Sequence, residues 1–391
     1  MISTVPLKRV TRMAYGDSLA TDTRIDGDFP VVGSGGVSGR HNAHNFRAPG
    51  IVVGRKGSYG SVHWLPDGGF AIDTAYYIDE RFTSADLRWL YYVLHAVDLR
   101  GPSQDVGVPG LAREAAYEVA VPVPPSLEEQ RRIADFLDAE TARIDKLVRL
   151  RSEQSALIGE GIAAEAVDLT GRSHIRRGGG TTENMVQLRR AAMSTQTGST
   201  PADLHDLSDG SAPEDNLPWY TPAAIDSWMS IATAEKTTHR DGAPLFPAGS
   251  VVITGIGESL GKVAHLNHVA TGNQQLTAIT PQVGVSGKFI AWQLWAAEQE
   301  IREWAQYSRI RIINNDSLKS FPIYLPSRAE QDTVVRTLDS HMVRVRQITD
   351  AFLRFQRLAD ERRQALISAA VTGQFDVSTA SGRNVTDGVS A

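Results

Sequence analysis

The sequence predicts an α+β protein in which two mixed α/β globules are bridged by two long antiparallel helices, with an approximate two-fold internal repeat. Three observations predict this fold. A hexapeptide occurs twice, as Pro125-Ser-Leu-Glu-Glu-Gln130 and as Pro326-Ser-Arg-Ala-Glu-Gln331. A short apolar strand precedes each copy, and a long stretch with helical spacing follows it. Each of these long stretches closes on a Thr-Gly pair, Thr170-Gly171 or Thr372-Gly373.

The strands that precede the hexapeptide are Val119–Pro124 and Phe321–Leu325. The repeat also reaches upstream of them. Leu7-Lys-Arg-Val corresponds to Leu188-Arg-Arg-Ala, and a Gly-rich apolar core at 49–60 corresponds to 248–261. β-branched runs between glycines predict strands with tight turns. Helix-like segments follow at 85–99 and 288–304. We therefore predict a first globule at 1–125, a central helix at 126–172, a second globule at 173–325, a C-terminal helix at 326–377 and a flexible tail at 378–391.

Both predicted helices carry an apolar stripe whose steps alternate between four and three residues. Such spacing is typical of a coiled-coil seam. Ser126 with Glu129, and Ser327 with Glu330, form the pattern of a capping box at the two helix starts. The alternative is that each helix packs only on its own globule. The predicted seam consists of Ile133, Leu137, Ile144, Leu147 and Ile158 in the first helix, and of Val334, Leu338, Val345, Ile348, Phe352 and Phe355 in the second.

Four polar residues fall within this stripe: Glu140, Arg151, Gln154 and His341. They either fix register and partner, or mark places where the seam opens to water or to another subunit. The sequence leaves both explanations open.

Composition limits the function classes. No apolar run approaches the roughly 20 residues of a membrane span. The chain has no cysteine, which excludes disulfides and thiolate metal sites and suits a reducing compartment. We therefore expect a soluble, cytoplasmic protein. Its net charge is −5, yet residues 31–66 hold four cations, three histidines and no acid. A locally basic face of this kind is compatible with DNA binding, although chance clustering on a solvated loop is the alternative.

The sharpest candidate for nucleic-acid contact is the Gly-bounded turn Gly54-Arg-Lys-Gly57. A guanidinium can pair with guanine or with phosphate through two bonds, whereas an ammonium suits phosphate. The alternative for Arg55 is that it caps a carboxylate of its own domain, such as Asp67 or Asp73. The candidate DNA-binding residues are Arg40, His41, His44, Arg55, Lys56, Ser58 and Tyr59 in the first copy, and Lys262, Arg309 and Arg311 in the second.

No catalytic constellation is visible. The glycine runs at 33–39 and 255–263 miss the spacing of dinucleotide-binding and Walker loops, and strained β-turns explain both better. His41 and His44 are close in sequence but have no neighbouring carboxylate, so we expect no metal site. The chain is predicted to be non-catalytic and to bind no cofactor.

A duplicated globule-plus-helix module joined through a Pro-Pro-x-x-Glu-Gln-like motif resembles the specificity subunit of type I restriction–modification systems. The resemblance covers residues 5–376. Its most specific signals run from Pro124 to Asp138 and from Leu325 to Val334, and the segments 31–39 and 54–60 also resemble the family's target-recognition domains. The second copy departs from it, with Leu325 in place of the first proline and Thr254-Gly-Ile-Gly257 in place of the Arg-Lys-Gly turn.

The resemblance implies two target-recognition domains that each read one half of a bipartite DNA site. It also implies two helices that act as a ruler and bind two methyltransferase subunits, with two motor-nuclease subunits joining afterwards. S-adenosylmethionine and ATP are then expected on those partners. Two rival hypotheses are a tandem-domain coiled-coil scaffold that binds proteins, and a standalone nuclease or methyltransferase, which the missing motifs disfavour.

Overall fold

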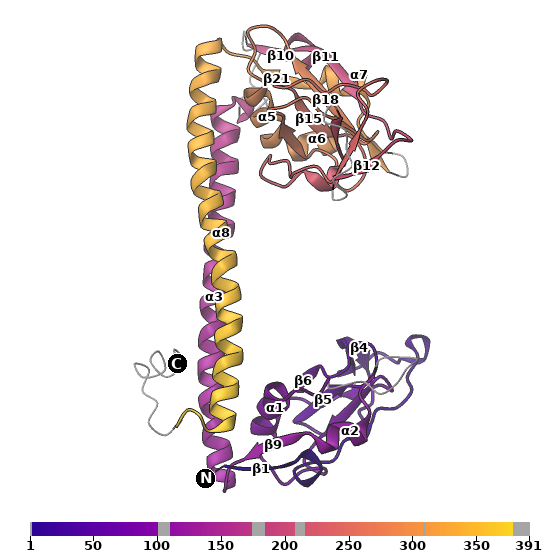
Figure 1. The fold of residues 1–391 in the computed structure, drawn as a ribbon, viewed down its shortest axis with the longest axis vertical. Coiled ribbons are helices and arrows are strands. Elements are labelled where there is room, and N and C mark those ends of the chain that lie inside the picture. The colour runs from indigo at the N-terminus through magenta and orange to yellow at the C-terminus, as the bar shows by residue number, and fades with distance from the viewer. Residues whose placement is uncertain (1, 101–109, 174–183, 208–215, 308–309, 378–391) are drawn as a thin grey trace. The chain divides into compact units, whose positions relative to one another are not determined.

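The computed structural model describes residues 2–100, 110–173, 184–207, 216–307 and 310–377 (Figure 1). The chain divides into two compact units. Unit 1 contains Met1–Arg151 together with Leu353–Ala391, and unit 2 contains Ser152–Phe352. The domain limits expected from the sequence remain a prediction, and the predicted flexible tail at 378–391 lies outside the described residues.

Unit 1 is built on two sheets. Four antiparallel strands run in the order β2 (Ala14–Tyr15), β8 (Ala75–Ile78), β5 (Gly50–Gly54) and β6 (Val62–Leu65). Three more run in the order β4 (Gly36–His41), β3 (Phe29–Gly33) and β7 (Phe70–Ala71). A separate antiparallel pair joins β1 (Ser3–Pro6) to β9 (Ala120–Val123), and the unit's short helices are α1 (Leu87–Ala96) and α2 (Arg113–Glu118).

Unit 2 repeats this plan. Its first sheet has the order β11 (Ala192–Thr197), β18 (Leu276–Pro281), β15 (Val251–Thr254) and β16 (Val263–His265). Its second has the order β12 (His205–Asp206), β14 (Lys236–Thr238), β13 (Leu217–Tyr220) and β17 (Thr271–Gly272). The pair β10 (Met185–Gln187) and β21 (Pro322–Tyr324) corresponds to β1 and β9, and the pair β19 (Gln306–Tyr307) and β20 (Arg311–Ile312) is additional.

The short helices of unit 2 are α5 (Gly287–Ala296), α6 (Glu298–Trp304) and α7 (Asn315–Ser320). The sequence predicts one helix over 288–304, but the structure has two, because the backbone leaves helical geometry at Ala297 (φ −103°, ψ 11°). The matching strand orders in the two units confirm the predicted α+β fold with an internal repeat.

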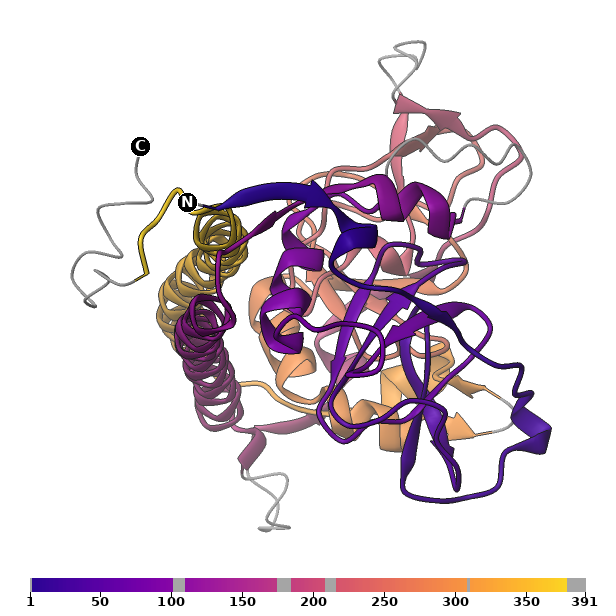
Figure 2. The same ribbon diagram turned by 90° about the horizontal axis from the view of Figure 1, so that it is seen from below.

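The two long helices are α3 (Leu127–Leu169) and α8 (Arg328–Thr372). In unit 1 the first half of α3 lies antiparallel to the second half of α8, and in unit 2 the second half of α3 lies antiparallel to the first half of α8 (Figures 1 and 2). Among the described residues, none of the helices combines the length and apolar character that a membrane span requires.

The buried stripe of α3 differs from the predicted seam. Leu147 is 47% exposed, and Arg151 and Gln154 are also exposed. Shielded positions instead recur every eleven residues, that is, every three turns at 11/3 residues per turn. Because this value is close to the 3.6 residues per turn of a straight helix, the repeat requires little supercoiling. These positions are Ile133, Ile144, Ser155 and Ala166, accompanied by Leu137, Val148 and Gly159.

The stripe of α8 keeps a seven-residue repeat, but around His341 and Ile348 the next residue, Met342 or Thr349, is the more buried one. Ile348 is 40% exposed, and its neighbour Thr349 is the more shielded residue. Val334, Phe352, Phe355 and, in α3, Ile158 are half-buried. The repeating positions are Leu338, Val345, Phe352, Ala359 and Leu366.

A glutamine of the repeated hexapeptide fixes the start of each long helix. The Oε1 atom of Gln130 accepts a hydrogen bond from the backbone N–H of Asp86 (2.8 Å), and that of Gln331 accepts one from Ser286 (2.9 Å). Both glutamines are buried. Asp86 and Ser286 are the N-caps of α1 and α5, so each glutamine joins a long helix to the helix of its own globule.

The predicted capping boxes lie beside these glutamines. The Ser126 hydroxyl accepts a hydrogen bond from the backbone N–H of Glu129 (3.2 Å). In the second copy both bonds of the box form, because the Glu330 carboxylate also accepts from the backbone N–H of Ser327 (3.0 Å). The Ser327 hydroxyl, followed by its backbone N–H, holds the pKa of Glu330 below its usual range.

We predict that Gln331→Ala lowers the free energy of unfolding by about 1–3 kcal/mol, because the N–H of Ser286 loses its partner in a buried position. Chemical denaturation of the full chain measures this change. Gln364→Ala, an exposed glutamine on the same helix, is the matched control and should change stability by less than about 0.5 kcal/mol. Equal effects of the two substitutions would contradict the anchoring role.

Candidate nucleic-acid interface

The turn at 54–60 is held by its own backbone. The backbone N–H of Gly54 donates to the backbone oxygen of Ser61, and the backbone N–H of Gly60 donates to the backbone oxygen of Gly54, both at 2.8 Å. A Cβ at Gly54 would lie 2.4 Å from the carbonyl oxygen of Ser58, so only glycine fits there. Gly57 has φ +71°, which also favours glycine. Backbone hydrogen bonds therefore close this loop, which presents the side chains between its glycines.

Arg55 and Lys56 are fixed by one carbonyl. The backbone N–H groups of both residues donate to Thr74, at 2.8 and 3.1 Å. The guanidinium of Arg55 contacts the backbone oxygen of Asp73 (Nη1 to O, 3.3 Å), not a carboxylate as the alternative hypothesis expected. The side chain of Lys56 is exposed. Arg55 is thus partly committed within its domain, whereas Lys56 projects into solvent.

Tyr15 and Arg113 join Arg55 in a cluster that the sequence alone does not identify. The ring of Tyr15, 44% exposed, lies 5.0 Å from the guanidinium carbon of Arg55 and 4.7 Å from that of Arg113. The Tyr76 ring packs edge-on against Tyr15 at 5.1 Å. Burial, and then the nearby Tyr15, raise the pKa of Tyr76 to about 12. A tyrosine between two cations forms an exposed surface that suits phosphate and bases.

The turn between β3 and β4 packs against this loop. The hydroxyl of Ser61 donates to the backbone oxygen of Ser34 (2.5 Å), and the Nε2 atom of His63 lies 3.1 Å from the same oxygen. Ser58 in the loop is exposed and Tyr59 is half-buried. The structure therefore brings Arg55, Lys56, Ser58 and Tyr59 together beside the 34–35 turn.

The other three candidates of the first copy lie at the opposite end of β4. Arg40 is exposed and donates to the backbone oxygens of Gly27 (3.2 Å) and Asp28 (2.7 Å). His44 is exposed, and its ring lies tilted against that of Phe29, with 4.7 Å between ring centroids. His41 is only 8% exposed, and its Nδ1 atom lies 3.1 Å from the backbone nitrogen of Ile25. The structure thus places His41 in the domain interior, against its expected position on the basic surface.

The second copy has the same loop with different side chains. The N–H of Thr254 donates to Lys262 and the N–H of Gly261 donates to Thr254, both at 2.9 Å. Gly255 and Ile256 occupy the places of Arg55 and Lys56, since Ile256 bridges to Ile312 as Lys56 bridges to Gly110. Lys262 is half-buried at the end of this loop. Arg311 is exposed, and its backbone oxygen accepts a hydrogen bond from the backbone N–H of Gly257. Arg309 lies outside the described residues.

Asp79 organises the loop that carries His44. Its carboxylate is fully buried and accepts hydrogen bonds from the backbone N–H groups of Arg47 (2.9 Å) and Arg81 (3.0 Å) and from the guanidinium of Arg81 (2.5 Å). Burial by itself raises the pKa of Asp79, but these hydrogen bonds more than offset it and hold the pKa below its usual range.

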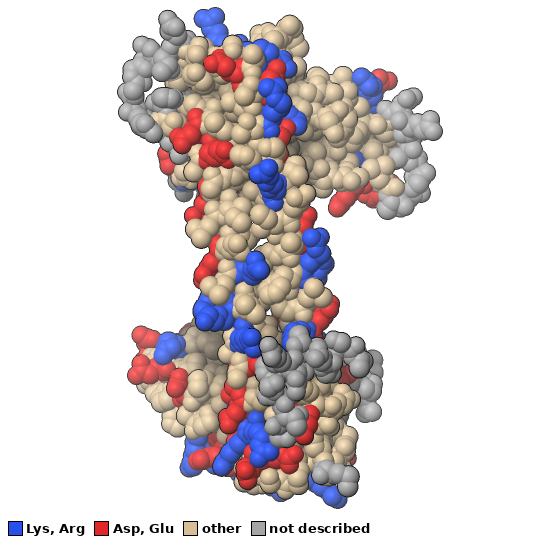
Figure 3. Space-filling model, turned by 90° about the vertical axis from the view of Figure 1, so that its left-hand side faces the viewer, with Lys and Arg blue, Asp and Glu red and all other residues tan. Residues whose placement is uncertain are grey.

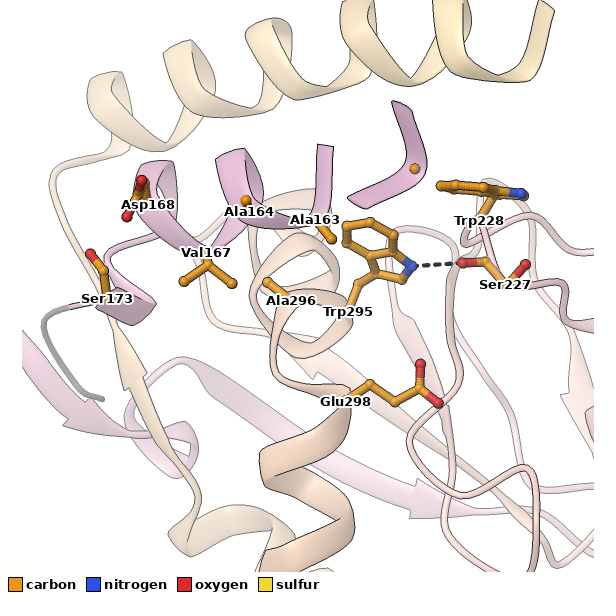
Figure 4. A pocket seen from close by; sticks show the side chains of 11 residues that line it. Ala163, Ala164, Val167, Asp168, Ser173, Ser227, Trp228, Trp295, Ala296 and Glu298 are labelled. Atoms are coloured by element: carbon orange, nitrogen blue, oxygen red, sulfur yellow. Dashed lines mark hydrogen bonds between the residues drawn. The ribbon is translucent and has the colours of Figure 1, made fainter. Parts of the chain in front are cut away.

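The exposed face of the two long helices carries interspersed charges of both signs, as Figure 3 shows. Near the end of α3, a cavity of about 680 Å³ is lined by Trp228 and Trp295 (Figure 4). The Nε1 atom of Trp295 donates to the backbone oxygen of Ser227 at 2.7 Å. Within the described residues, no group of three or more His, Asp or Glu side chains could hold a metal ion.

The family model of the type I restriction modification DNA specificity domain matches the chain twice, at residues 4–153 and 199–348. The chain belongs to this family. The two matches fall on the two copies of the repeat. A family of specificity domains serves recognition and not catalysis, which confirms the expectation of a non-catalytic chain.

The specificity subunit of the type I restriction enzymes EcoR124I and EcoR124II of Escherichia coli is 28% identical over 149 residues, which span 36% of this chain and 37% of that protein. A chain from a structure of complex assembly and conformational transition in a type I R-M system superposes with a TM-score of 0.74 at 16% identity, covering 96% of this chain and 98% of that one. The HsdS subunit of Thermoanaerobacter tengcongensis superposes with a TM-score of 0.51 at 17% identity, and the superposition covers 96% of this chain and 97% of that one. These two structures share the fold of this specificity-family chain.

We predict that Asp79→Asn lowers the free energy of unfolding by about 1–3 kcal/mol at neutral pH, because an amide NH2 then faces the donors of Arg81 and Arg47. A carboxyl group with a depressed pKa stabilises the fold above its unfolded pKa of roughly 4, and this contribution is lost as pH falls through the folded pKa. As the pH falls below about 4, the free energy of unfolding should therefore decrease less for the variant than for the wild type.

Denaturation midpoints measured between neutral and acidic pH check this prediction. Asp67→Asn, at an exposed position of the same domain, serves as the control and should follow the wild-type curve. A variant curve parallel to that of the wild type would show that Asp79 contributes no pH-dependent stability.

Proposed function

We propose that the chain is the DNA-recognition subunit of a cytoplasmic type I restriction–modification complex. Each recognition domain reads one half of a bipartite site in double-stranded DNA. The long helices act as the ruler between the halves and as a docking surface for two methyltransferase subunits, and two motor-nuclease subunits complete the complex. This chain binds no cofactor, and S-adenosylmethionine and ATP belong to the partners.

The observation that carries this proposal is the duplicated glycine loop, which closes through corresponding backbone hydrogen bonds in both copies but presents two sets of side chains. Both copies close with the same pair of backbone hydrogen bonds, yet the first presents Arg55 and Lys56 where the second presents Gly255 and Ile256. A common loop with different side chains suits two domains that read two different half-sites, because base choice depends on side chains.

We predict different effects of the two cations on DNA binding by the assembled methyltransferase. Lys56→Ala should weaken binding to the specific site and to random duplex alike, and should reduce the salt slope by roughly one ion. Arg55→Ala should cost about 1–3 kcal/mol on the specific site and relax discrimination at one position. Binding measured over a range of salt concentrations gives both quantities.

Lys8→Ala is the matched control, because Lys8 is an exposed lysine of the same domain that pairs with Glu118 at 2.6 Å. It should leave the affinity for both duplexes close to that of the wild type. If Lys56→Ala and Arg55→Ala also leave both affinities unchanged, this loop is not part of the DNA interface. A wild-type complex that does not prefer any duplex would favour the protein-binding scaffold instead.

We also predict that removing residues 327–391 abolishes assembly with two methyltransferase subunits, because α8 supplies one of the two long helices and also Leu366 and Ile367 of the unit 1 core. Removing only 378–391 is the control and should preserve assembly. Native mass spectrometry of the purified complexes counts the subunits. Two methyltransferase subunits on the long truncation would contradict helix-mediated docking.

A further inference from the structure

The two units join α3 to α8 through different polar side-chain pairs. In unit 1 the guanidinium of Arg363 on α8 donates to the carboxylate of Asp145 on α3. In unit 2 the Nδ1 atom of His341 on α8 lies 2.7 Å from the Oε2 atom of Glu165 on α3. Each pair joins the first half of one long helix to the second half of the other.

The first halves of the two helices correspond residue by residue. Gln130 and Gln331 each accept a hydrogen bond from the N-cap residue of a globule helix. Asp138 and Asp339 repeat this correspondence: Asp138 accepts from Tyr92 (2.5 Å), and Asp339 accepts from Trp292 (3.0 Å). The same spacing places Glu140 where α8 has His341, and Arg346 where α3 has Asp145.

This correspondence determines what each helix would meet in a copy of itself. If two α3 helices paired as α3 pairs with α8, Glu140 would take the place of His341 and face Glu165. If two α8 helices paired, Arg346 would take the place of Asp145 and face Arg363. A pair of two identical helices is symmetric, so the contact between like charges would occur twice in it. Each helix would therefore meet a charge of its own sign at one of these positions in a copy of itself.

These side chains are partly shielded from water, which increases the effect of their charges. The side chain of Glu140 is 19% exposed, and those of Glu165 and Arg363 are 36% and 30% exposed. Arg346 is half-buried and donates to the backbone oxygen of Trp228 at 2.5 Å. Charges at partly buried positions are screened less by solvent and salt than charges on an open surface.

A packing contact in unit 2 favours the same choice of partner. The indole of Trp228 lies against Gly159 of α3, where an added Cβ would be 3.1 Å from the Cη2 atom of that indole. The second half of α8 contains no glycine between residues 355 and 371. Pairing of α8 with a second α8 would therefore bring a Cβ against Trp228 at this point.

We infer that the charges along the two helices select the partner helix, so that α3 binds α8 and neither helix binds a copy of itself. The surface on the second half of α3 fits the first half of α8, whether that helix comes from the same chain or from a second chain. The inference concerns pairing alone and holds whether or not the domains read DNA.

The test uses the full chain, cut only after it has folded. A protease site is inserted between residues 173 and 184, which interrupts no described helix or strand. Cleavage gives a first piece with α3 and a second piece with α8. First pieces carrying two different tags are mixed, left to exchange, captured through one tag and analysed by native mass spectrometry. The wild type should yield first pieces bound to second pieces, with complexes of two first pieces about tenfold rarer or less.

Glu140→Lys should raise the yield of complexes between two first pieces at least about tenfold, because the new lysine faces Glu165 across that pair. It leaves both native pairs between α3 and α8 in place. Glu160→Lys makes the same charge change at an exposed position of α3 and is the control. In about 1 M salt, where the screening length falls to about 3 Å, the difference between the two variants should shrink.

A second variant tests the other helix. Exchanging the charges of the unit 1 pair, as Asp145→Arg with Arg363→Asp, keeps α3 and α8 complementary. It also places the new aspartate opposite Arg346 in a pair of α8 helices. Complexes of two second pieces should then increase at least about tenfold. Frequent like pairs in the wild type, or no difference between Glu140→Lys and Glu160→Lys, would overturn the inference.

Discussion

Each globule depends on a helix end that the other copy of the repeat supplies. Leu366 and Ile367, near the end of α8, belong to the buried core of unit 1, together with Trp89 of α1. Ile162 and Ala166, near the end of α3, belong to a buried cluster of unit 2 with Trp292 of α5. Replacing a buried leucine or isoleucine, such as Leu366 or Ile162, by alanine typically costs about 2–5 kcal/mol. Neither copy can therefore bury its own surface without the helix of the other.

This exchange explains why the helix starts are so strongly determined. A helix that must reach a second globule needs a fixed origin and a fixed rotation about its axis. The buried glutamine supplies the origin, and the aspartate eight residues later fixes the rotation, since both face α1 or α5 of the same globule. Burial, and then the bond to Asp138, raise the pKa of Tyr92 to about 12, so its hydroxyl remains a donor to that carboxylate at neutral pH.

The parts of the fold that could be predicted from sequence are those whose signal is local or repeated. The duplication, the caps at Ser126 and Ser327 and the glycine loops follow from short motifs. The seam could not be predicted fully, because Leu147 and Val148 are both apolar and sequence spacing does not distinguish a seven-residue from an eleven-residue repeat there. The choice depends on which side chains meet a globule, and that is a tertiary property.

The candidate interface shows the same limit. Glycine spacing located the loop at 54–60, because only glycine fits where a Cβ would meet Ser58. Nothing in the sequence relates Tyr15 or Arg113 to that loop, since they approach it from distant strands and helices. His41 looked like a surface cation among basic neighbours, yet the strand alternation of β4 turns it inward beside Phe70.

The two copies also show how one fold can present two different sets of side chains. Backbone hydrogen bonds, not side chains, close the loops at 54–60 and 254–261, so this closure does not depend on the side chains that the loops present. Changes such as Arg55 to glycine between the copies then alter what a loop can contact without altering how it folds. The same reasoning applies to the long helices. Both begin with the same buried glutamine, Gln130 or Gln331, whereas the polar residues farther along the two helices differ.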